Sequence, residues 1–557
     1  MKLLLNFFWL LFLLPVCQVA AQGVYVRFAS VDKRYENLAV PEVSHSENTW
    51  KAMAWKGEKV HTQFLIRTTK SLENVRLEWG DLAGQKGNKI DAVNISSNFV
   101  RYVMTDGLNA KGSGCGISQG LDSSLVEDLI TTQKEIGVNG NTTQPVWLSI
   151  KVPVNTPAGI YKGYVKVKNG NKQIGELDYT VQVVNRILPE AKNWKFYLDL
   201  WQNPYSIARV HRVQPWSKAH MEIMQPYMKM LANAGQKAIT ATIIYDPWNS
   251  QTEDIYGSMV KWTRTKDGTW VYDYSIFDQW VSYMMSLGID KLINCYSMIP
   301  WDLKFYYYDE ARGKDTFLVA APGTAAYQAH WTNMLKDFTR HLKQKGWFEK
   351  TTIAMDERSV ADMQKAIEII KSVDKDFRVS LAGNIHPEIE GDLFDYSIAS
   401  DQKVQSTVIK QRQQAGLNTT FYTCCLEGFP NTFTFSPPAE SAWLGWYAAN
   451  KGFDGYLRWA YNCWPKNPLR DSRFGKWSAG DTYLVYPGPQ TSIRFERLIE
   501  GIQDFEKISI LKKEYQKTRQ QGKLERLAAI LEKFEISNLT TINAEKMLNE
   551  AKQFLND

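Results

Sequence analysis

Hydrophobic and polar residues alternate along the first third of the chain in a way that favours short β-strands. Residues 61–67, 75–79 and 147–152 alternate with a period of two, the spacing at which successive side chains point to opposite faces of a strand. Residues 163–168 and 177–183 flank Asn169-Gly170, a dipeptide typical of a tight hairpin turn. Several short strands joined by such turns predict a β-sandwich domain over residues 22–188.

From Trp194 onwards the pattern changes to apolar runs that alternate with amphipathic segments. The runs are typical of buried strands and span residues 194–201, 237–245, 291–296, 351–356, 378–382, 393–399, 419–424 and 455–460. Apolar residues at helical spacing occur between them, at residues 219–234, 275–287, 324–344 and 360–373. Eight such units in about 270 residues predict an α/β fold, a (β/α)8 TIM barrel over residues 189–510.

Three helices are expected beyond the eighth barrel strand, at residues 492–514, 524–534 and 542–555. In the first of them, Leu498, Ile502, Phe505 and Ile508 share one face, which indicates packing against the barrel. Residues 511–557 are expected to form a C-terminal helical segment beside it.

The first residues have the pattern of a cleaved export signal. Lys2 precedes an apolar stretch over residues 3–14, and Val19-Ala20-Ala21 supplies the small residues of a cleavage site before Gln22. We therefore exclude the signal peptide, residues 1–21, from the fold and expect a periplasmic or extracellular protein of a bacterium. No later segment has the uninterrupted apolar run of about 18 residues that a transmembrane helix needs, so none is expected.

Composition and charge narrow the class of partner. The net charge of +7 comes from basic residues scattered among acidic ones, so the chain has no basic run typical of nucleic-acid binding. The cysteines beyond Cys17 do not have metal-ligand spacing with histidines, although an oxidising compartment would permit one disulfide. We expect neither a metal nor an organic cofactor, and no pattern indicates an oligomeric state. Most of the 20 Trp, 27 Tyr and 24 Phe are expected in the core, but those clustered in predicted loops offer flat faces on which sugars can stack.

The fourth predicted barrel strand ends in two adjacent acids, Asp356 and Glu357. Carboxylates at the end of a buried strand are unfavourable unless they are paired or used in chemistry. The alternative is a strand end where both acids face solvent or cap the next helix. Catalytic groups of barrels lie at the C-terminal ends of the strands, and pairs of acids break glycosidic bonds, so the position favours catalysis.

Polar and aromatic residues also follow the other predicted strands and gather at the same end of the barrel. Each one alone is as well explained by a structural role, but the set predicts a carbohydrate site. The residues that we expect to contact substrate are Tyr245, Trp248, Asn384, Tyr422, Arg458, Trp459, Tyr461 and Trp464. The expected partner is therefore an oligosaccharide or a glycoconjugate.

Two mechanisms remain open for Glu357. In an ordinary retaining glycosidase, Glu357 protonates the leaving oxygen and Glu427, just beyond the seventh strand, attacks the anomeric carbon. In a substrate-assisted enzyme, the 2-acetamido oxygen of the substrate attacks, and a neighbouring carboxylate orients the amide and stabilises its positive charge. Asp356 directly before Glu357 suits the second mechanism. A third alternative is a glycan-binding surface protein that keeps the barrel only as a scaffold.

The acid pair, the sandwich and two C-terminal motifs resemble glycoside hydrolase family 123. The motifs are Gly480-Asp-Thr-Tyr-Leu-Val-Tyr-Pro-Gly488 and Ser492-Ile-Arg-Phe-Glu-Arg-Leu-Ile-Glu-Gly-Ile-Gln-Asp-Phe-Glu506. The resemblance implies an exo-acting β-N-acetylgalactosaminidase that retains configuration by substrate assistance. It also implies that Glu357 is the general acid/base and Asp356 the stabiliser of the oxazolinium. A tyrosine that binds the acetamido oxygen is expected by the same analogy, with Tyr422 the first candidate and Tyr461 the second.

Overall fold

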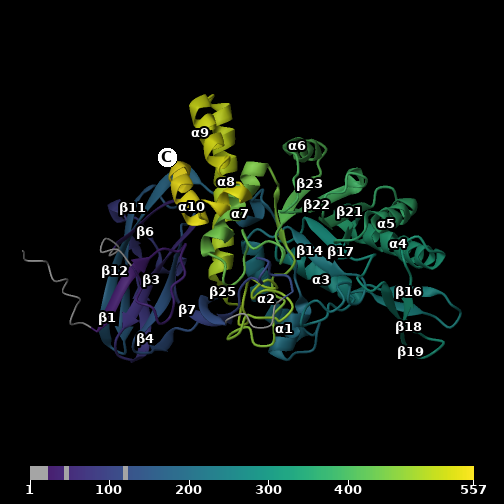
Figure 1. Ribbon diagram of the computed structural model, residues 1–557, viewed down its shortest axis with the longest axis horizontal. Helices are drawn as coiled ribbons and strands as arrows, with labels where there is room; N and C mark the ends of the chain where they lie inside the picture. The colour runs from purple at the N-terminus through teal and green to yellow at the C-terminus, as the bar shows by residue number, and fades with distance from the viewer. Residues whose placement is uncertain (1–22, 43–48, 117–122, 557) are drawn as a thin grey trace, which may run out of the picture.

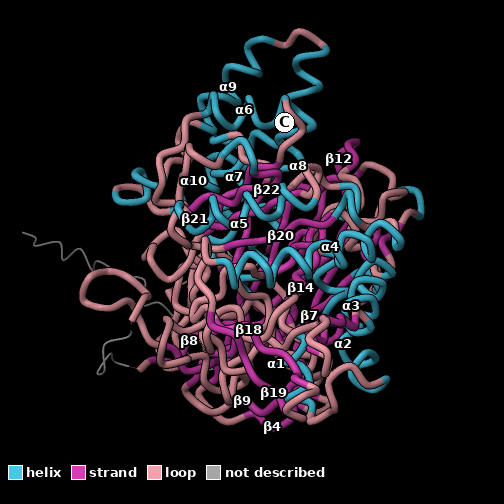
Figure 2. Tube along the Cα trace, turned by 90° about the vertical axis from the view of Figure 1, so that its right-hand side faces the viewer, coloured by secondary structure: helices cyan, strands magenta, loops and turns pink. Residues whose placement is uncertain are grey.

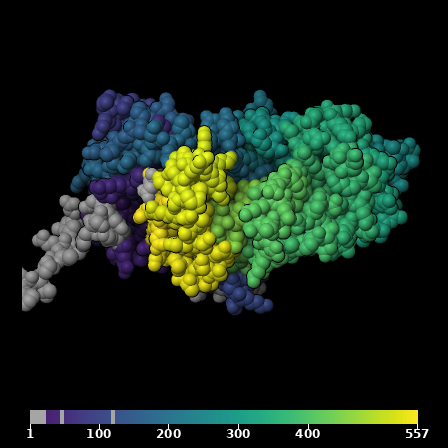
Figure 3. All heavy atoms as spheres, turned by 90° about the horizontal axis from the view of Figure 1, so that it is seen from above, coloured from purple at the N-terminus to yellow at the C-terminus, as the bar shows by residue number. Residues whose placement is uncertain are grey.

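The computed structural model describes residues 23–42, 49–116 and 123–556, and the expected signal peptide lies outside these ranges. Figure 1 shows a strand-rich N-terminal part on the left, a barrel of strands and helices on the right, and the C-terminal helices between them. Seen from above, the C-terminal residues (yellow) lie between the purple N-terminal residues and the green part of the barrel (Figure 3). No helix within the described residues is long and apolar enough to cross a membrane.

The N-terminal part is the expected β-sandwich. One sheet contains, in spatial order, β1 (Val24–Ala29), β3 (Lys59–Thr68), β10 (Thr142–Lys151), β7 (Ile95–Thr105), β8 (Ser124–Ile130) and β25 (Thr491–Ser492). The other contains β2 (Thr49–Lys56), β12 (Lys172–Ile187), β11 (Gly159–Asn169), β4 (Leu72–Trp79) and β9 (Glu135–Val138), with the short β5 (Leu82–Ala83) and β6 (Lys89–Ile90) beside them. The predicted hairpin turn joins β11 to β12, and Gly170 adopts the φ of 58° that such a turn requires.

The eight predicted barrel strands are confirmed, and they form one parallel sheet. They are β13 (Tyr197–Leu200), β14 (Ala238–Thr242), β17 (Leu292–Tyr296), β20 (Thr351–Met355), β21 (Arg378–Gly383), β22 (Leu393–Ala399), β23 (Asn418–Tyr422) and β24 (Gly455–Arg458). The helices that cover them are α1 (Pro204–His211), α2 (Lys218–Asn233), α3 (Ser275–Ser286), α4 (Ala325–Lys345), α5 (Val360–Val373), α6 (Ser406–Gln414) and α7 (Pro438–Lys451).

Side chains help to close the barrel between β13 and β14, where backbone pairing is reduced to a bridge between Leu198 and Gln236. The amide of Gln236 accepts a hydrogen bond from the Leu200 N–H at 2.9 Å, and that of Gln202 accepts one from the Thr240 N–H at 2.9 Å. These side chains satisfy backbone donors that an incomplete ladder would leave unpaired.

A second, four-stranded sheet grows out of two loops at the C-terminal end of the barrel and was not predicted from the sequence. Its strands, in spatial order, are β16 (Trp270–Asp273), β15 (Lys261–Arg264), β18 (Lys304–Asp309) and β19 (Lys314–Val319). In Figure 2, β18 and β19 lie below α3 and α4. The inner face of this sheet packs on α4, with the Trp262 ring stacked on His330 at 4.6 Å.

The second C-terminal motif forms α8 (Ile493–Lys517), which joins the sandwich to the barrel. Buried ion pairs link it to the sandwich, between Arg494 and Asp128 at 2.9 Å and between Arg497 and Asp32. On the barrel side it crosses α7 so closely that a Cβ on Gly445 would lie 2.0 Å from the Gly501 carbonyl oxygen. The remaining helices, α9 (Gln521–Leu531) and α10 (Ala544–Lys552), follow it.

Candidate active site

Asp356 and Glu357 lie directly after β20, at the C-terminal end of the barrel. Asp356 is buried, with 7 % of the residue exposed, whereas Glu357 is exposed. The backbone leaves the strand at this point, so the two neighbouring side chains enter different environments. One acid is held inside the protein, and the other remains accessible to a substrate.

One hydrogen bond and one ion pair hold the Asp356 carboxylate. The Trp301 indole Nε1–H donates to Oδ2 at 2.9 Å, and the Arg358 guanidinium lies 3.2 Å from Oδ1. Burial raises the pKa of Asp356 above its usual range, the Arg358 charge and the Trp301 hydrogen bond lower it, and Glu357 raises it slightly. Arg358 also lies over the Trp301 ring, 3.8 Å from its centroid, so the two side chains that hold Asp356 pack against each other.

Tyr422, at the end of β23, contacts the other acid. Its hydroxyl donates to Glu357 Oε1 at 2.5 Å, and only 5 % of the residue is exposed. Burial, followed by the Glu357 charge, raises the pKa of the phenol well above its usual range. Tyr422 therefore stays protonated and remains a hydrogen-bond donor at this end of the barrel.

The buried surroundings of the acids differ between the two sides of the barrel. Bulky rings lie at or just beyond the ends of β13, β14 and β17, namely Trp201, Trp248 and Tyr296. The Trp201 ring centroid lies 4.5 Å from that of Tyr296 and 5.1 Å from that of Trp248. On the opposite side, the ends of β20, β21 and β22 carry only alanines in the same apolar cluster, namely Ala354, Ala382 and Ala399. The cluster fills the same end of the barrel at which burial raises the pKa of Asp356.

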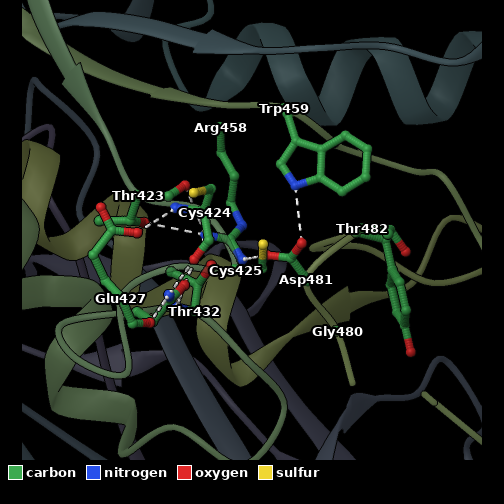
Figure 4. Close-up of polar contacts among 12 residues, drawn as sticks. Thr423, Cys424, Cys425, Glu427, Thr432, Arg458, Trp459, Gly480, Asp481 and Thr482 are labelled. Carbon is green, nitrogen blue, oxygen red and sulfur yellow. Dashed lines mark hydrogen bonds and ion pairs between the residues drawn. The ribbon is translucent and has the colours of Figure 1, made fainter. Parts of the chain in front are cut away.

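Arg458 and Trp459 share one carboxylate, that of Asp481 (Figure 4). Arg458 Nη2 lies 2.7 Å from Asp481 Oδ1, and the Trp459 Nε1–H donates to Oδ2 at 3.0 Å. Arg458 is completely buried and also donates to Asn431 Oδ1 at 2.8 Å. The structure therefore places Arg458 inside the protein rather than on a surface that a substrate could reach, which corrects the expectation for this residue. Trp459 is half-buried and belongs to the cluster at the barrel end.

Tyr461 and Trp464 also depart from the expectation, because both are completely buried away from the acids. The Tyr461 hydroxyl donates to the Tyr227 carbonyl at 2.9 Å, and the Trp464 Nε1–H donates to the Val485 carbonyl at 2.6 Å. Beyond β24 the chain bends and its backbone pairs with neighbouring segments, and the two rings pack against Tyr227 of α2 and Phe495 of α8. Both residues do follow the end of β24, as expected, but their side chains are buried instead of facing a substrate.

Tyr245, Trp248 and Asn384 lie at the expected end of the barrel. Tyr245 is 38 % exposed, Trp248 is 6 % exposed within the aromatic cluster, and Asn384 is exposed. Asn384 follows β21 beside the acid pair, since a Cβ on the preceding Gly383 would lie 3.8 Å from Glu357 Cα.

Glu427 lies in the loop after β23 next to Cys424 (Figure 4), and both of its carboxylate oxygens accept hydrogen bonds from the protein. It accepts hydrogen bonds from the Ser400 hydroxyl at 2.5 Å and from the Cys424 N–H at 2.9 Å. The same loop is tied to the sandwich by a disulfide between Cys115 and Cys425. These contacts favour a structural role for Glu427.

Trp301, Arg358 and Asp481 are the residues of this region that were not selected from the sequence. Arg358 directly follows the acid pair, and Trp301 follows Pro300 in the loop after β17, so a local signal existed for both. Among the described residues, no group of three or more His, Cys, Asp or Glu side chains could hold a metal ion.

Family models match both parts of the chain. The model of the glycoside hydrolase 123 catalytic domain matches residues 201–511, which is more than half of the chain, and the model of the glycoside hydrolase 123 N-terminal domain matches residues 28–169. The chain belongs to glycoside hydrolase family 123. It is thus a glycoside hydrolase with a glycan substrate, as the resemblance of its motifs indicated.

A solved structure supports the family assignment over nearly the whole chain. A family 123 glycoside hydrolase from Clostridium perfringens, which was studied for glycolipid glycan hydrolysis, matches with a TM-score of 0.84 and 26 % identity, over 96 % of this chain and 99 % of that one. A family 39 glycoside hydrolase from Bacteroides cellulosilyticus matches with a TM-score of 0.36 and 12 % identity, over 82 % of each chain, which is too weak to carry an argument. A search of curated proteins found no significant match.

Proposed function

We propose that this family 123 hydrolase releases terminal β-linked N-acetylgalactosamine from the non-reducing end of a glycan, with retention and with assistance from the substrate's own acetamido group. The observation that carries the proposal is the unequal pair after β20. A buried carboxylate held by Trp301 and Arg358 lies beside an exposed one that accepts the Tyr422 hydroxyl.

In the first step, the acetamido carbonyl oxygen attacks the anomeric carbon as the glycosidic C–O bond breaks. The Glu357 carboxyl group gives its proton to the leaving oxygen. The Asp356 carboxylate accepts the acetamido N–H and stabilises the positive charge that develops on the oxazolinium. The Arg358 charge favours the ionised form of Asp356, which this role requires, in spite of its burial.

In the second step, the Glu357 carboxylate removes a proton from a water molecule, whose oxygen attacks the anomeric carbon and opens the oxazoline ring. Two displacements on the same carbon give net retention. Tyr422 is the donor that we assign to the acetamido oxygen, because its protonated hydroxyl already lies at Glu357. Trp459 and Trp248 belong to the apolar cluster at the barrel end, where ring faces suit a sugar.

The glycan of a glycolipid or another glycoconjugate is the substrate that we propose, in line with the glycolipid glycans of the Clostridium perfringens relative. Export by the N-terminal segment would place the enzyme where such glycans are found. We propose a periplasmic or extracellular location on this basis.

The proposal is tested with aryl β-glycosides of N-acetylgalactosamine, N-acetylglucosamine and galactose, assayed side by side. We expect turnover of the N-acetylgalactosaminide and none of the galactoside, which lacks the acetamido nucleophile. Glu357→Gln should abolish hydrolysis of a natural oligosaccharide, whose leaving group is poor, while binding survives. Binding of the wild-type protein without turnover would favour a lectin-like protein, and rapid cleavage of the galactoside would favour double displacement through Glu427.

A further inference from the structure

The sheet formed by β15, β16, β18 and β19 has one buried face, and its other face is left uncovered by the described residues of the chain. Phe305 and Trp262 on the inner face are 1 % and 4 % exposed. The outer face is nevertheless rich in apolar groups, because Phe317 is 47 % exposed and Val319 is 60 % exposed. Exposed apolar side chains gathered on one surface mark a binding site more often than a tolerated defect.

Two barrel loops that contact each other connect this outer face to the acids. Trp301, whose indole Nε1–H donates to Asp356, is 43 % exposed. The backbone N–H of Trp301 donates to the Pro247 carbonyl of the loop after β14 at 3.1 Å. Two residues before Pro247, the Tyr245 ring packs edge-on against Tyr306 of β18 at 5.1 Å. Tyr306 in turn lies 5.4 Å from Phe317 of β19. Trp301, Tyr245, Tyr306 and Phe317 form what we call the outer strip.

We propose that the outer strip binds the sugar residues on the leaving-group side of the scissile bond, so that the enzyme recognises an oligosaccharide beyond its terminal unit. This inference rests on the proposed function and deepens it. Both loops that carry the strip follow the C-terminal ends of β14 and β17, where barrel enzymes bind substrate. A glycan that extends from the acids past Trp301 would lie along these two loops, which carry Tyr245 and Tyr306.

The chemistry of the strip fits a sugar better than it fits a lipid surface or a second copy of the chain. Tyr245 and Tyr306 combine a flat ring with a hydroxyl, which matches the apolar face and polar edge of a pyranose. Polar groups are interspersed on the same face, where Lys304 lies over the Phe317 ring at 5.6 Å and pairs with Asp302 at 3.2 Å. Most importantly, the strip begins at a direct hydrogen-bond partner of Asp356.

The test compares two substrates that end in the same β-linked N-acetylgalactosamine. One is the aryl glycoside, which has no sugar beyond the scissile bond, and the other is a soluble tetrasaccharide. Tyr306→Ala and Phe317→Ala should raise KM for the tetrasaccharide by about tenfold, which corresponds to one lost stacking contact, and leave the aryl glycoside unchanged. Tyr164→Ala is the matched control, since Tyr164 is an exposed tyrosine beside a lysine on the sandwich.

Equal kinetic constants for the variants and the wild type on the tetrasaccharide would overturn the proposal. Loss of flotation with phosphatidylcholine vesicles, without any change on the tetrasaccharide, would also overturn it and assign the strip to a membrane surface. If the wild-type protein turns over neither substrate, the proposed function fails. The inference about the outer strip can still be decided by binding: the affinity for the tetrasaccharide is measured by titration into Glu357→Gln and into the double variant Glu357→Gln/Phe317→Ala. Tenfold weaker binding with Phe317→Ala would support it, and equal binding would contradict it.

Discussion

Replacing Arg358 with methionine removes the positive charge beside Asp356 while keeping a flexible side chain that packs on the Trp301 ring. The guanidinium lies 3.2 Å from Asp356 Oδ1, and both side chains are only 11 % exposed, so water screens the pair weakly. Substrate assistance requires an ionised Asp356. Since burial already raises the pKa of this carboxyl group, the loss of Arg358 must raise it further.

The expected magnitude follows from the distance and the burial. An arginine next to an aspartate lowers the carboxyl pKa by about 1 to 3, and this contribution disappears in Arg358→Met. Asp356 is active when it is deprotonated, so activity falls as the pH drops through its pKa. A higher pKa therefore moves the acidic limb of the kcat/KM profile upwards by about 1 to 3 pH units.

The assay is the pH dependence of kcat/KM for the aryl N-acetylgalactosaminide, measured for the wild type, Arg358→Met and Arg358→Lys. The lysine variant keeps a positive charge and should have an acidic limb close to that of the wild type. An acidic limb at the same pH in all three proteins would refute the role of Asp356 as a carboxylate that Arg358 keeps ionised.

Three further substitutions test the structure around the acids. Glu427→Gln keeps an acceptor oxygen for the Cys424 N–H and should retain most of the activity; a loss by a factor of about 10^4 or more would instead assign Glu427 as a nucleophile. Asp481→Asn leaves Arg458 buried without its counter-ion and should lower the free energy of unfolding in urea by about 3–5 kcal/mol. Trp459→Phe removes one neutral donor to the same carboxylate and should lower that free energy by about 1 kcal/mol, so equal values for the two variants would contradict this account. Serine at both Cys115 and Cys425 should lower the free energy of unfolding by about 2–5 kcal/mol, visible as a lower melting temperature, and an unchanged melting temperature would mean that the bridge does not stabilise the fold.

The barrel could be predicted from the sequence because its strands are buried on both faces. Such strands appear as continuous apolar runs, and β20 with its pattern of five buried residues is an example. The four-stranded sheet escaped prediction because β15 and β16 have four residues each, and because β15 pairs in parallel with β18, which lies far along the chain. Pairing of that kind leaves no local signal.

In the site, too, the residues with a local sequence signal could be predicted, and those placed by contacts between distant segments could not. Asp356 and Glu357 were found from a local pattern, a buried strand that ends in two acids. The direction of Tyr461 and Trp464 depends on how the chain pairs beyond β24, which their spacing does not reveal. The disulfide joins cysteines separated by 310 positions, so only the packing of the sandwich against the barrel brings them together.

The central claim is that the substrate's acetamido oxygen is the nucleophile, and it is tested most directly by changing that group alone. The measurement is kcat/KM for aryl β-glycosides whose acetamido methyl group carries zero, one, two or three fluorines. Fluorine withdraws electrons from the carbonyl oxygen and weakens it as a nucleophile, so we predict that kcat/KM falls steeply along the series. Equal values for the four substrates would contradict substrate assistance and return the role of nucleophile to a carboxylate of the protein.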